Sequence, residues 1–327
     1  MGLSNKEKYE EFCRIVEVPI YSKSWWLDAV CLPENWDVWI LESNGTMLAA
    51  MPYYFENRKG LRYITKAPLT QNNGILFNYP DGSKPVARAI FEEKVIESAC
   101  EFIKSLNLDV YEQQYQPIFT NWLPFFWNHY TAITRYTYVI KDTSKLNDVW
   151  DEISSKRRSV IKKGQRNSTL SLELSVNDFY QEHEKIYLKQ GLQCPFSYDL
   201  WDRVSTACIT HNAGQISCRV ADDGNVAAVS FVAWDSKAVY KLMGGPMPDY
   251  AKLDAYSALT WDEIELASRL GLMYDFEGSV IKRISKSFRE YGATPMPYFR
   301  IRKVFNPEII RQEAEKAIEQ LKEQEGE

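Results

Sequence analysis

The 327-residue chain has few of the residues that hold metals or form disulfides. Its three histidines, His129, His183 and His211, lie far apart, and its six cysteines are scattered without a Cys-x-x-Cys pair. Zinc sites need closely spaced ligands of these types, and disulfide-rich secreted domains need a framework of paired cysteines. The sequence therefore predicts a reduced protein with no metal centre.

Long hydrophobic runs are missing as well. The first eight residues contain no apolar signal-peptide core, and no apolar run approaches the ~18 residues that span a bilayer. We therefore expect a cytoplasmic protein with no integral membrane segment. The net charge of −5 argues against a chain built wholly to bind nucleic acid, although it allows a local basic surface.

What the chain does contain is a series of elements that occurs twice. Residues 38–51 and 218–231 are each two apolar runs joined by a turn dipeptide, Asn-Gly in the first and Asp-Gly in the second. Such dipeptides are a strong hairpin signal. Each hairpin is followed by a long predicted helix, over residues 86–106 and 253–270, and then by another strand. The order favours two tandem units of mixed helix and strand.

Polar stretches of the sequence indicate where the two predicted units begin and end. A polar stretch follows residue 140, so we place the first domain at residues 1–141 and the second at residues 142–306. Residues 307–327 are polar with apolar positions at heptad-like spacing, which predicts a C-terminal helix. This helix either docks or frays at the end of the chain, or binds a partner.

Paired glycines follow a predicted strand at residues 238–243. We expect Gly244 and Gly245 to break the strand and lead into the long helix, whose free backbone N–H groups would dock an anion or acyl group. Lys241 lies in the strand just before this break. Its side chain could bind a carboxylate or phosphate, but an edge lysine that points to solvent is favoured.

A basic segment stands out in this acidic chain. Apolar residues from Leu146 to Gly164 form one helical stripe, and Arg157 lies in the middle of it. A buried arginine cannot lose its charge, so it needs an internal carboxylate or a bound anion, such as a phosphate, a nucleotide-linked substrate or an RNA backbone. Arg158 and Lys162 point elsewhere and are further substrate-binding candidates.

Residues 272–277 are predicted to form the strand after the second long helix. Side chains alternate along a strand, so Tyr274 shares one face with two apolar residues, and Asp275 and Glu277 share the other, roughly 7 Å apart. Either carboxylate could deprotonate an attacking amine. Alternatively, they cap a turn or pair with the basic residues that follow.

Several segments, in this order, resemble the Fem/methicillin-resistance group of peptidyl transferases and the related BioF2-like acetyltransferase domains of the GNAT superfamily. They are residues 136–144 with the basic helix, the helix and strand at residues 261–278, and the closing segment at residues 287–301. The resemblance implies an α/β (α+β) fold with two tandem GNAT-like acyltransferase domains, their mixed sheets flanked by helices. It also implies transfer of an acyl or aminoacyl group to an amine.

In Fem enzymes the donor is an aminoacyl-tRNA and the acceptor is a peptidoglycan precursor, which would place the chain in cell wall biogenesis. Other GNAT enzymes use acyl-CoA, but residues 243–248 lack the Gln/Arg-x-x-Gly-x-Gly/Ala loop that holds CoA. The family's closing Phe-Lys pair has Phe288 and Arg289 as its nearest equivalents, with Lys286 close by.

We therefore expect an N-acyltransferase with no tightly bound cofactor and with a small-molecule or nucleotide-linked peptide substrate. Asp275 or Glu277 would be the base, and Arg289, Lys286 or main-chain N–H groups near Gly244 would stabilise the oxyanion. Arg157 and Arg158 would hold an anionic substrate. The other candidates for substrate binding are Lys162, Lys241, Gly244, Gly245, Tyr274, Lys286 and Phe288. The alternative is a protein of the same fold that binds a cell-wall precursor or tRNA without catalysis.

Overall fold

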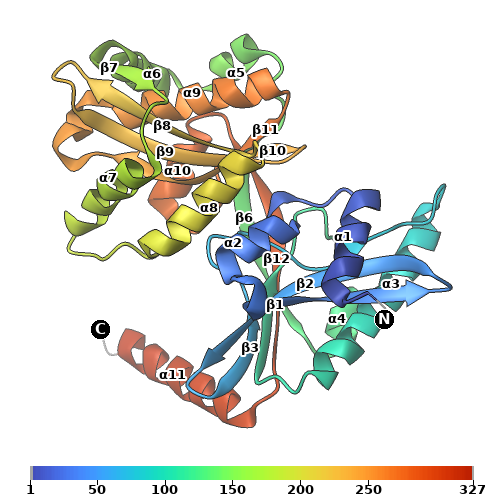
Figure 1. The fold of residues 1–327 in the computed structure, drawn as a ribbon. Helices are drawn as coiled ribbons and strands as arrows, with labels where there is room; N and C mark the ends of the chain where they lie inside the picture. Colours follow the sequence, from blue (N-terminus) through green and yellow to red (C-terminus); the bar gives the residue numbers. More distant parts are fainter. Residues whose placement is uncertain (1–2, 326–327) are drawn as a thin grey trace. The chain divides into compact units, whose positions relative to one another are not determined.

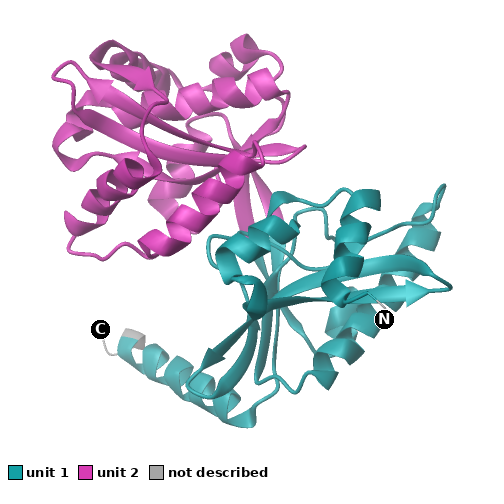
Figure 2. Ribbon diagram, in the orientation of Figure 1, with its two compact units in different colours: residues 1–134, 298–327 teal, residues 135–297 magenta. Residues whose placement is uncertain are grey.

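The computed structural model describes residues 3–325, whose helices and strands are drawn in Figure 1. The chain divides into two compact units, coloured separately in Figure 2. Unit 1 contains the residues up to Thr134 and from Tyr298 onward, and unit 2 is Arg135–Pro297. The chain therefore passes twice from one unit to the other, because residues after 297 return to unit 1. The domain boundaries expected at residues 141 and 306 stay predictions.

Unit 1 is built on a sheet with the strand order β1-β2-β3-β5-β12, and β4 pairs with β2. Its core includes Trp39, Tyr111 and Ile301. The expected hairpin at residues 38–51 and the helix at residues 86–106 are confirmed, as β1 with β2 and as α3. The elements are α1 (Asn5–Ile15), α2 (Ser24–Cys31), β1 (Trp36–Ser43), β2 (Thr46–Arg58), β3 (Leu61–Thr65), β4 (Leu76–Phe77), α3 (Pro85–Ser105), β5 (Val110–Gln114), α4 (Leu123–Trp127), β12 (Thr294–Val304) and α11 (Pro307–Glu325). The last two residues of the predicted C-terminal helix lie outside the described residues.

Unit 2 contains a mixed sheet with the order β6-β11-β10-β9-β8-β7, in which β10 and β11 are parallel. The expected hairpin at residues 218–231 and the long helix after it are confirmed, as β8 with β9 and as α9. The elements are β6 (Thr131–Ile140), α5 (Leu146–Glu152), α6 (Ser155–Asn167), β7 (Ser168–Ser171), α7 (Val176–Leu188), α8 (Tyr198–Thr210), β8 (Gly214–Ala221), β9 (Val226–Trp234), β10 (Ala238–Pro246), α9 (Ala255–Leu270), β11 (Met273–Asp275) and α10 (Lys282–Arg289). A 3-10 helix, Pro248–Leu253, joins β10 to α9.

Helices cover both faces of the unit 2 sheet (Figure 1). Neighbouring residues on β9 show this, because Phe231 packs edge-on against Trp201 of α8 while Val232 clusters with Ile264 of α9. In the described part of the chain, no helix is long and apolar enough to cross a bilayer. A side chain of the unit 2 sheet therefore meets a different set of helices depending on the face from which it projects.

The basic segment forms two helices rather than the single stripe expected from Leu146. Helix α5 ends at Glu152, Ile153 is extended, and the Ser154 hydroxyl caps α6 by accepting from the Arg157 N–H at 3.3 Å. The cap satisfies one of the free N–H groups at the start of α6. The basic residues of α6 therefore follow a separate helix axis from the residues of α5.

Helix α6 packs closely against α9 at Gly164. A Cβ atom at this position would lie 2.9 Å from the Ala258 Cβ and would also meet the Asp254 carbonyl. We therefore expect Gly164→Ala to lower the free energy of unfolding by about 1–3 kcal/mol, measured by urea denaturation. Gln165→Ala, at the exposed neighbouring position of the same helix, is the control. An unchanged stability for Gly164→Ala would show that the helices separate without cost.

Candidate functional site

The two parallel strands of unit 2 pair only briefly. Strand β11 pairs with β10 from Ala238 to Tyr240, whereas β10 continues to Pro246 alongside β9. In the described part of the chain, no strand pairs with this edge of β10 after Tyr240. An unpaired strand edge presents free N–H and C=O groups, so it can bind an extended substrate or a developing oxyanion.

The paired glycines lie within β10, so the expected strand-breaking turn at Gly244 and Gly245 is wrong. Gly244 has a φ of +149°, and a Cβ there would lie 2.8 Å from the Ser230 Cα on β9. A Cβ on Gly245 would lie 2.9 Å from Ile186 on α7. The glycines are therefore explained by close packing, and α9 begins only at Ala255, after the 3-10 helix.

Asp275 lies at the point where β10 and β11 separate. Its carboxyl group is 2% exposed. It accepts hydrogen bonds from the Thr137 hydroxyl on β6 and from the Glu277 N–H, the latter at 2.7 Å. Burial raises the pKa of Asp275 to about 7, although both hydrogen bonds favour the ionised form. A carboxyl group with this pKa exchanges protons at neutral pH, as a general base must.

Glu277 does not share a strand face with Asp275, so that expectation is wrong. Strand β11 ends at Asp275, and Glu277 has a φ of +66°, a left-handed conformation. Its carbonyl also lies within hydrogen-bond distance of the Thr137 hydroxyl, so Asp275 and the Glu277 carbonyl share the single proton of that hydroxyl. Thr137 therefore holds together the end of β11 and the start of the following segment, and sequence reasoning missed it because its role depends on the pairing of β6 with β11.

The pKa of Asp275 predicts a specific pH dependence of stability. Below about pH 4 the carboxyl group is protonated in both the folded and unfolded states. As the pH rises, the unfolded chain loses this proton first, so the folded state is progressively destabilised until the pH passes about 7. Over this window the wild type should lose up to roughly 4 kcal/mol of stability relative to Asp275→Asn. Urea unfolding of both proteins measures the difference, and a difference that stays constant with pH would contradict the shifted pKa.

Lys241 projects into the core, so the expectation that it points to solvent is wrong. Its ammonium group lies 2.7 Å from the Glu263 carboxylate and 2.9 Å from the Thr260 hydroxyl, both on α9. Tyr274 of β11 donates to the same Glu263 oxygen. Burial is the largest single influence and opposes the charge of Lys241, but Glu263, Tyr256 and Tyr291 together outweigh it, and the pKa of Lys241 lies above its usual value. The candidates Lys241 and Tyr274 thus lie in an internal network that joins β10, β11 and α9.

Arg157 has the internal carboxylate that was one of the two expectations for it. It donates to Glu290 at 2.7 Å and to the hydroxyls of Ser257 and Ser287 at 3.0 Å, and its guanidinium lies over the Tyr291 ring. These contacts tie α6 to α9 and to the end of α10. The structure therefore places Arg157 as a connector inside unit 2.

The remaining basic candidates lie nearer the surface. Arg158 donates to the carbonyl groups of Trp150 and Asp151, and Lys162 is exposed with its ammonium group 5.6 Å from the Trp150 ring. On α10, Lys286 and Arg289 are exposed. These four cations are therefore better placed than Arg157 to meet an anionic substrate.

Phe288 lies on the buried side of α10. Its ring packs against those of Tyr138 and Phe276, with centroids 5.7 and 4.8 Å away. Phe276 follows directly after Asp275, so α10 is packed onto the chain beside the buried carboxyl group. Arg289, the neighbour of Phe288, is turned about 100° around the helix and is exposed.

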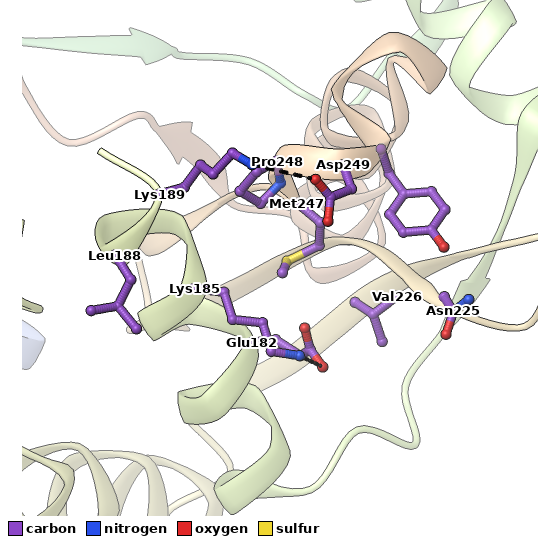
Figure 3. Close-up of a pocket in the computed structure, with 10 residues that line it drawn as sticks. Glu182, Lys185, Leu188, Lys189, Asn225, Val226, Met247, Pro248 and Asp249 are labelled. Carbon is purple, nitrogen blue, oxygen red and sulfur yellow. Dashed lines mark hydrogen bonds and ion pairs between the residues drawn. The ribbon is translucent and has the colours of Figure 1, made fainter. Parts of the chain in front are cut away.

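A cavity of about 580 Å³ opens at the far end of β10 (Figure 3). Glu182 and Lys185 of α7, and Lys189 directly after it, contribute charges to its wall, and Met247 and Asp249 lie on the other side. Tyr240, which pairs with Asp275, is seven residues before Met247, or about 20 Å along a strand. The cavity and the buried carboxyl group are therefore two places, which only an elongated substrate could occupy together.

The geometry can be compared with known proteins. Residues 151–282, which lie within unit 2, match the family model described as an acetyltransferase (GNAT) domain. The search of curated proteins found no match. The match covers the elements from α6 to the start of α10 and therefore includes β10, β11 and Asp275.

Among solved structures, FemX resembles the chain with a TM-score of 0.70 and 10% identity, covering 95% of this chain and 98% of FemX. The C-terminal domain of a putative lysylphosphatidylglycerol synthetase from Agrobacterium fabrum has a TM-score of 0.54 and 13% identity, covering 91% of this chain and 92% of that domain. A tandem GNAT protein from the clavulanic acid biosynthesis pathway has a TM-score of 0.50 and 11% identity, covering 88% of this chain and 97% of that protein. The mixed α/β fold and the likeness to Fem and GNAT proteins are confirmed.

Proposed function

We propose that this GNAT-fold protein transfers an acyl or aminoacyl group to an amine, with the reaction at the separation of β10 and β11. The observation that carries the proposal is Asp275. It is a buried carboxyl group with a pKa of about 7 at the end of β11, beside the unpaired edge of β10. A carboxyl group that exchanges protons near neutral pH can remove a proton from an amine. Asp275 is such a group, and it lies where β10 and β11 stop pairing.

The proposed step is nucleophilic attack by that amine. The Asp275 carboxylate takes a proton from the amine, whose nitrogen then bonds to the carbonyl carbon of the donor. The carbonyl oxygen becomes an oxyanion, stabilised by N–H groups on the open edge of β10 near Gly244 or by Arg289 or Lys286. The bond from carbon to the donor's leaving oxygen or sulfur then breaks, and the leaving group takes up the proton that Asp275 removed, which restores the Asp275 carboxylate. Because Asp275 is 2% exposed, its carboxyl group must become accessible before it can contact a substrate.

The donor we favour is an aminoacyl-tRNA, with acyl-CoA as the alternative. Residues 243–248 lack the CoA-binding pattern, and residues 243–246 are occupied by the end of β10. Exposed cations on α6 and α10 suit a polyanionic donor. The likeness to FemX supports a peptidoglycan precursor as the acceptor. Arg158, Lys162, Lys286 and Arg289 are the residues we propose for binding the anionic parts of these substrates.

The test is turnover by the full chain. The protein is incubated with aminoacyl-tRNA or with acyl-CoA, together with a panel of nucleotide-linked muramyl peptides, and the mass of each acceptor is followed. A mass increase equal to one acyl or aminoacyl group, minus water, is the expected result. If every donor and acceptor remains unchanged while the protein is folded, the proposed activity is wrong for these substrate classes.

A second function is binding without catalysis, and one set of contacts favours it. Arg157 and Lys241 are both held in internal ion pairs, with Glu290 and Glu263, and Asp275 is buried. Residues committed to internal contacts cannot also bind a substrate without rearranging. Isothermal titration with the same muramyl peptides and tRNA separates the two functions, because saturable binding in the absence of any mass change would favour the binding protein.

A further inference from the structure

The segment that leads into α10 exposes two aliphatic side chains side by side. Val280 is 70% exposed and Ile281 is 56% exposed, and both lie in the loop between β11 and α10. Single exposed aliphatic residues are ordinary on protein surfaces, but here two are adjacent, at the end of the loop where α10 begins. Tyr136 adds an aromatic ring that is 44% exposed, and its carbonyl lies against Gly278 at the start of the same loop.

Directly after this apolar pair, α10 presents a cationic face. Lys282, Lys286 and Arg289 recur at helical spacing along one side, and Arg283 adjoins them. All four are exposed, and none forms an ion pair among the residues that the structure describes. Helix α10 itself contains no acidic residue, and Glu290, which follows it, is already bonded to Arg157.

The opposite side of α10 fixes the direction in which this face points. Phe288 packs on Tyr138 and Phe276, and the hydroxyls of Ser285 and Tyr138 lie 2.7 Å apart. Ser287 accepts a hydrogen bond from Arg157. The helix is therefore anchored to unit 2 by its uncharged residues. These contacts fix its orientation, so its cations face solvent.

We propose that residues 279–283 form a docking surface for an anionic lipid bilayer. Val280 and Ile281 would enter the boundary between headgroups and acyl chains, and the adjoining cations Lys282 and Arg283 would meet the anionic headgroups. Two aliphatic side chains favour a membrane over RNA, because proteins bind exposed RNA bases by stacking aromatic rings and reading polar edges. The chain as a whole carries a charge of −5, so its attraction to an anionic surface would have to be local.

The experiment is sedimentation of the full chain with sucrose-loaded vesicles. Vesicles of phosphatidylcholine alone are compared with an equal mixture of phosphatidylcholine and phosphatidylglycerol, at low and high salt. We expect binding to the anionic vesicles that weakens with salt. The double variant Lys282→Glu, Arg283→Glu should reduce the partition coefficient by about 30-fold or more, since each lost cation near an anionic surface costs about fivefold.

The variant Val280→Ser, Ile281→Ser separates this proposal from simple charge attraction. It changes no charge, and we expect it to reduce vesicle binding about tenfold or more because insertion of the aliphatic side chains is lost. The matched controls are Lys316→Glu, Lys322→Glu on the exposed face of α11, and Ile118→Ser, an exposed aliphatic residue of unit 1. Circular dichroism confirms that each variant is folded.

Three outcomes would overturn the proposal. The first is no binding to anionic vesicles by the wild type. The second is a loss of binding that is as large in the control variants as in the α10 variants. The third is binding of a duplex RNA that the α10 charge reversal abolishes while vesicles are not bound, which would make the surface an RNA-binding one. None of these outcomes depends on whether the protein transfers acyl groups.

Discussion

Replacing Asp275 by asparagine should lower the rate of acyl transfer by about 10²- to 10⁴-fold, the range typical for loss of a general base. The side chain keeps its size, and an asparagine carbonyl oxygen can still accept from the Thr137 hydroxyl and the Glu277 N–H. What is lost is the ability to take up a proton. The effect should therefore appear in kcat, with little change in the binding of the acceptor.

The pH profile distinguishes a base from a residue that only supports the loop. In the wild type, kcat should rise with pH through a pKa near 7, because the active form of Asp275 is the carboxylate. The Asp275→Asn variant should lack this rise. Glu277→Gln, in the left-handed residue two positions later, is the matched control and should retain most of the activity and the rise with pH. If Asp275→Asn and Glu277→Gln both keep full activity, neither carboxylate is the base.

Local sequence signals predicted the elements on which this site is built. Turn dipeptides placed both hairpins, because Asn-Gly and Asp-Gly adopt the backbone angles that tight turns need, and Asn44 and Gly45 both have a positive φ. The long helix predicted after each hairpin was placed to within two residues of α3 and α9. These signals are local, and each is read from residues that lie next to one another in the chain.

The position of the paired glycines was predicted wrongly for a tertiary reason. Glycine pairs usually mark turns, because glycine tolerates a positive φ. Here the constraint at Gly244 and Gly245 is the close approach of β9 and α7, which no neighbouring residue reveals. A strand that needs glycine for packing and a strand that ends at glycine look the same in the sequence.

For the charged residues, the sequence predicted the chemical type of partner but not which residue supplies it. The helical stripe correctly implied that Arg157 needs a partner, but Glu290 lies 133 residues away in the sequence. For Lys241 the strand pattern gave the wrong direction, because Glu263 enters from a helix that follows later in the chain. Burial of a charge is decided by the packing of distant elements, whereas its chemical requirement is set by the residue alone.

Removing the charge of Lys241 should cause a large loss of stability in unit 2. Lys241→Met fills a similar volume but leaves Glu263, which is 1% exposed, without the cation 2.7 Å away. A buried carboxylate that loses its partner destabilises a fold by about 3–5 kcal/mol. We expect urea denaturation to show a loss of this size. Lys252→Met, at an exposed position before α9, is the control and should change stability little.

A second substitution distinguishes the uncompensated charge from a packing defect. In Lys241→Met, Glu263→Gln the buried charge is gone, and the glutamine carbonyl can still accept the hydrogen bond that Tyr274 donates to Glu263. This double variant should therefore recover most of the stability that Lys241→Met loses. If it is no more stable than Lys241→Met, the ion pair is not what holds β10, β11 and α9 together. A recovered fold would also keep Asp275 in place, because Tyr274, its neighbour on β11, would again be anchored to α9.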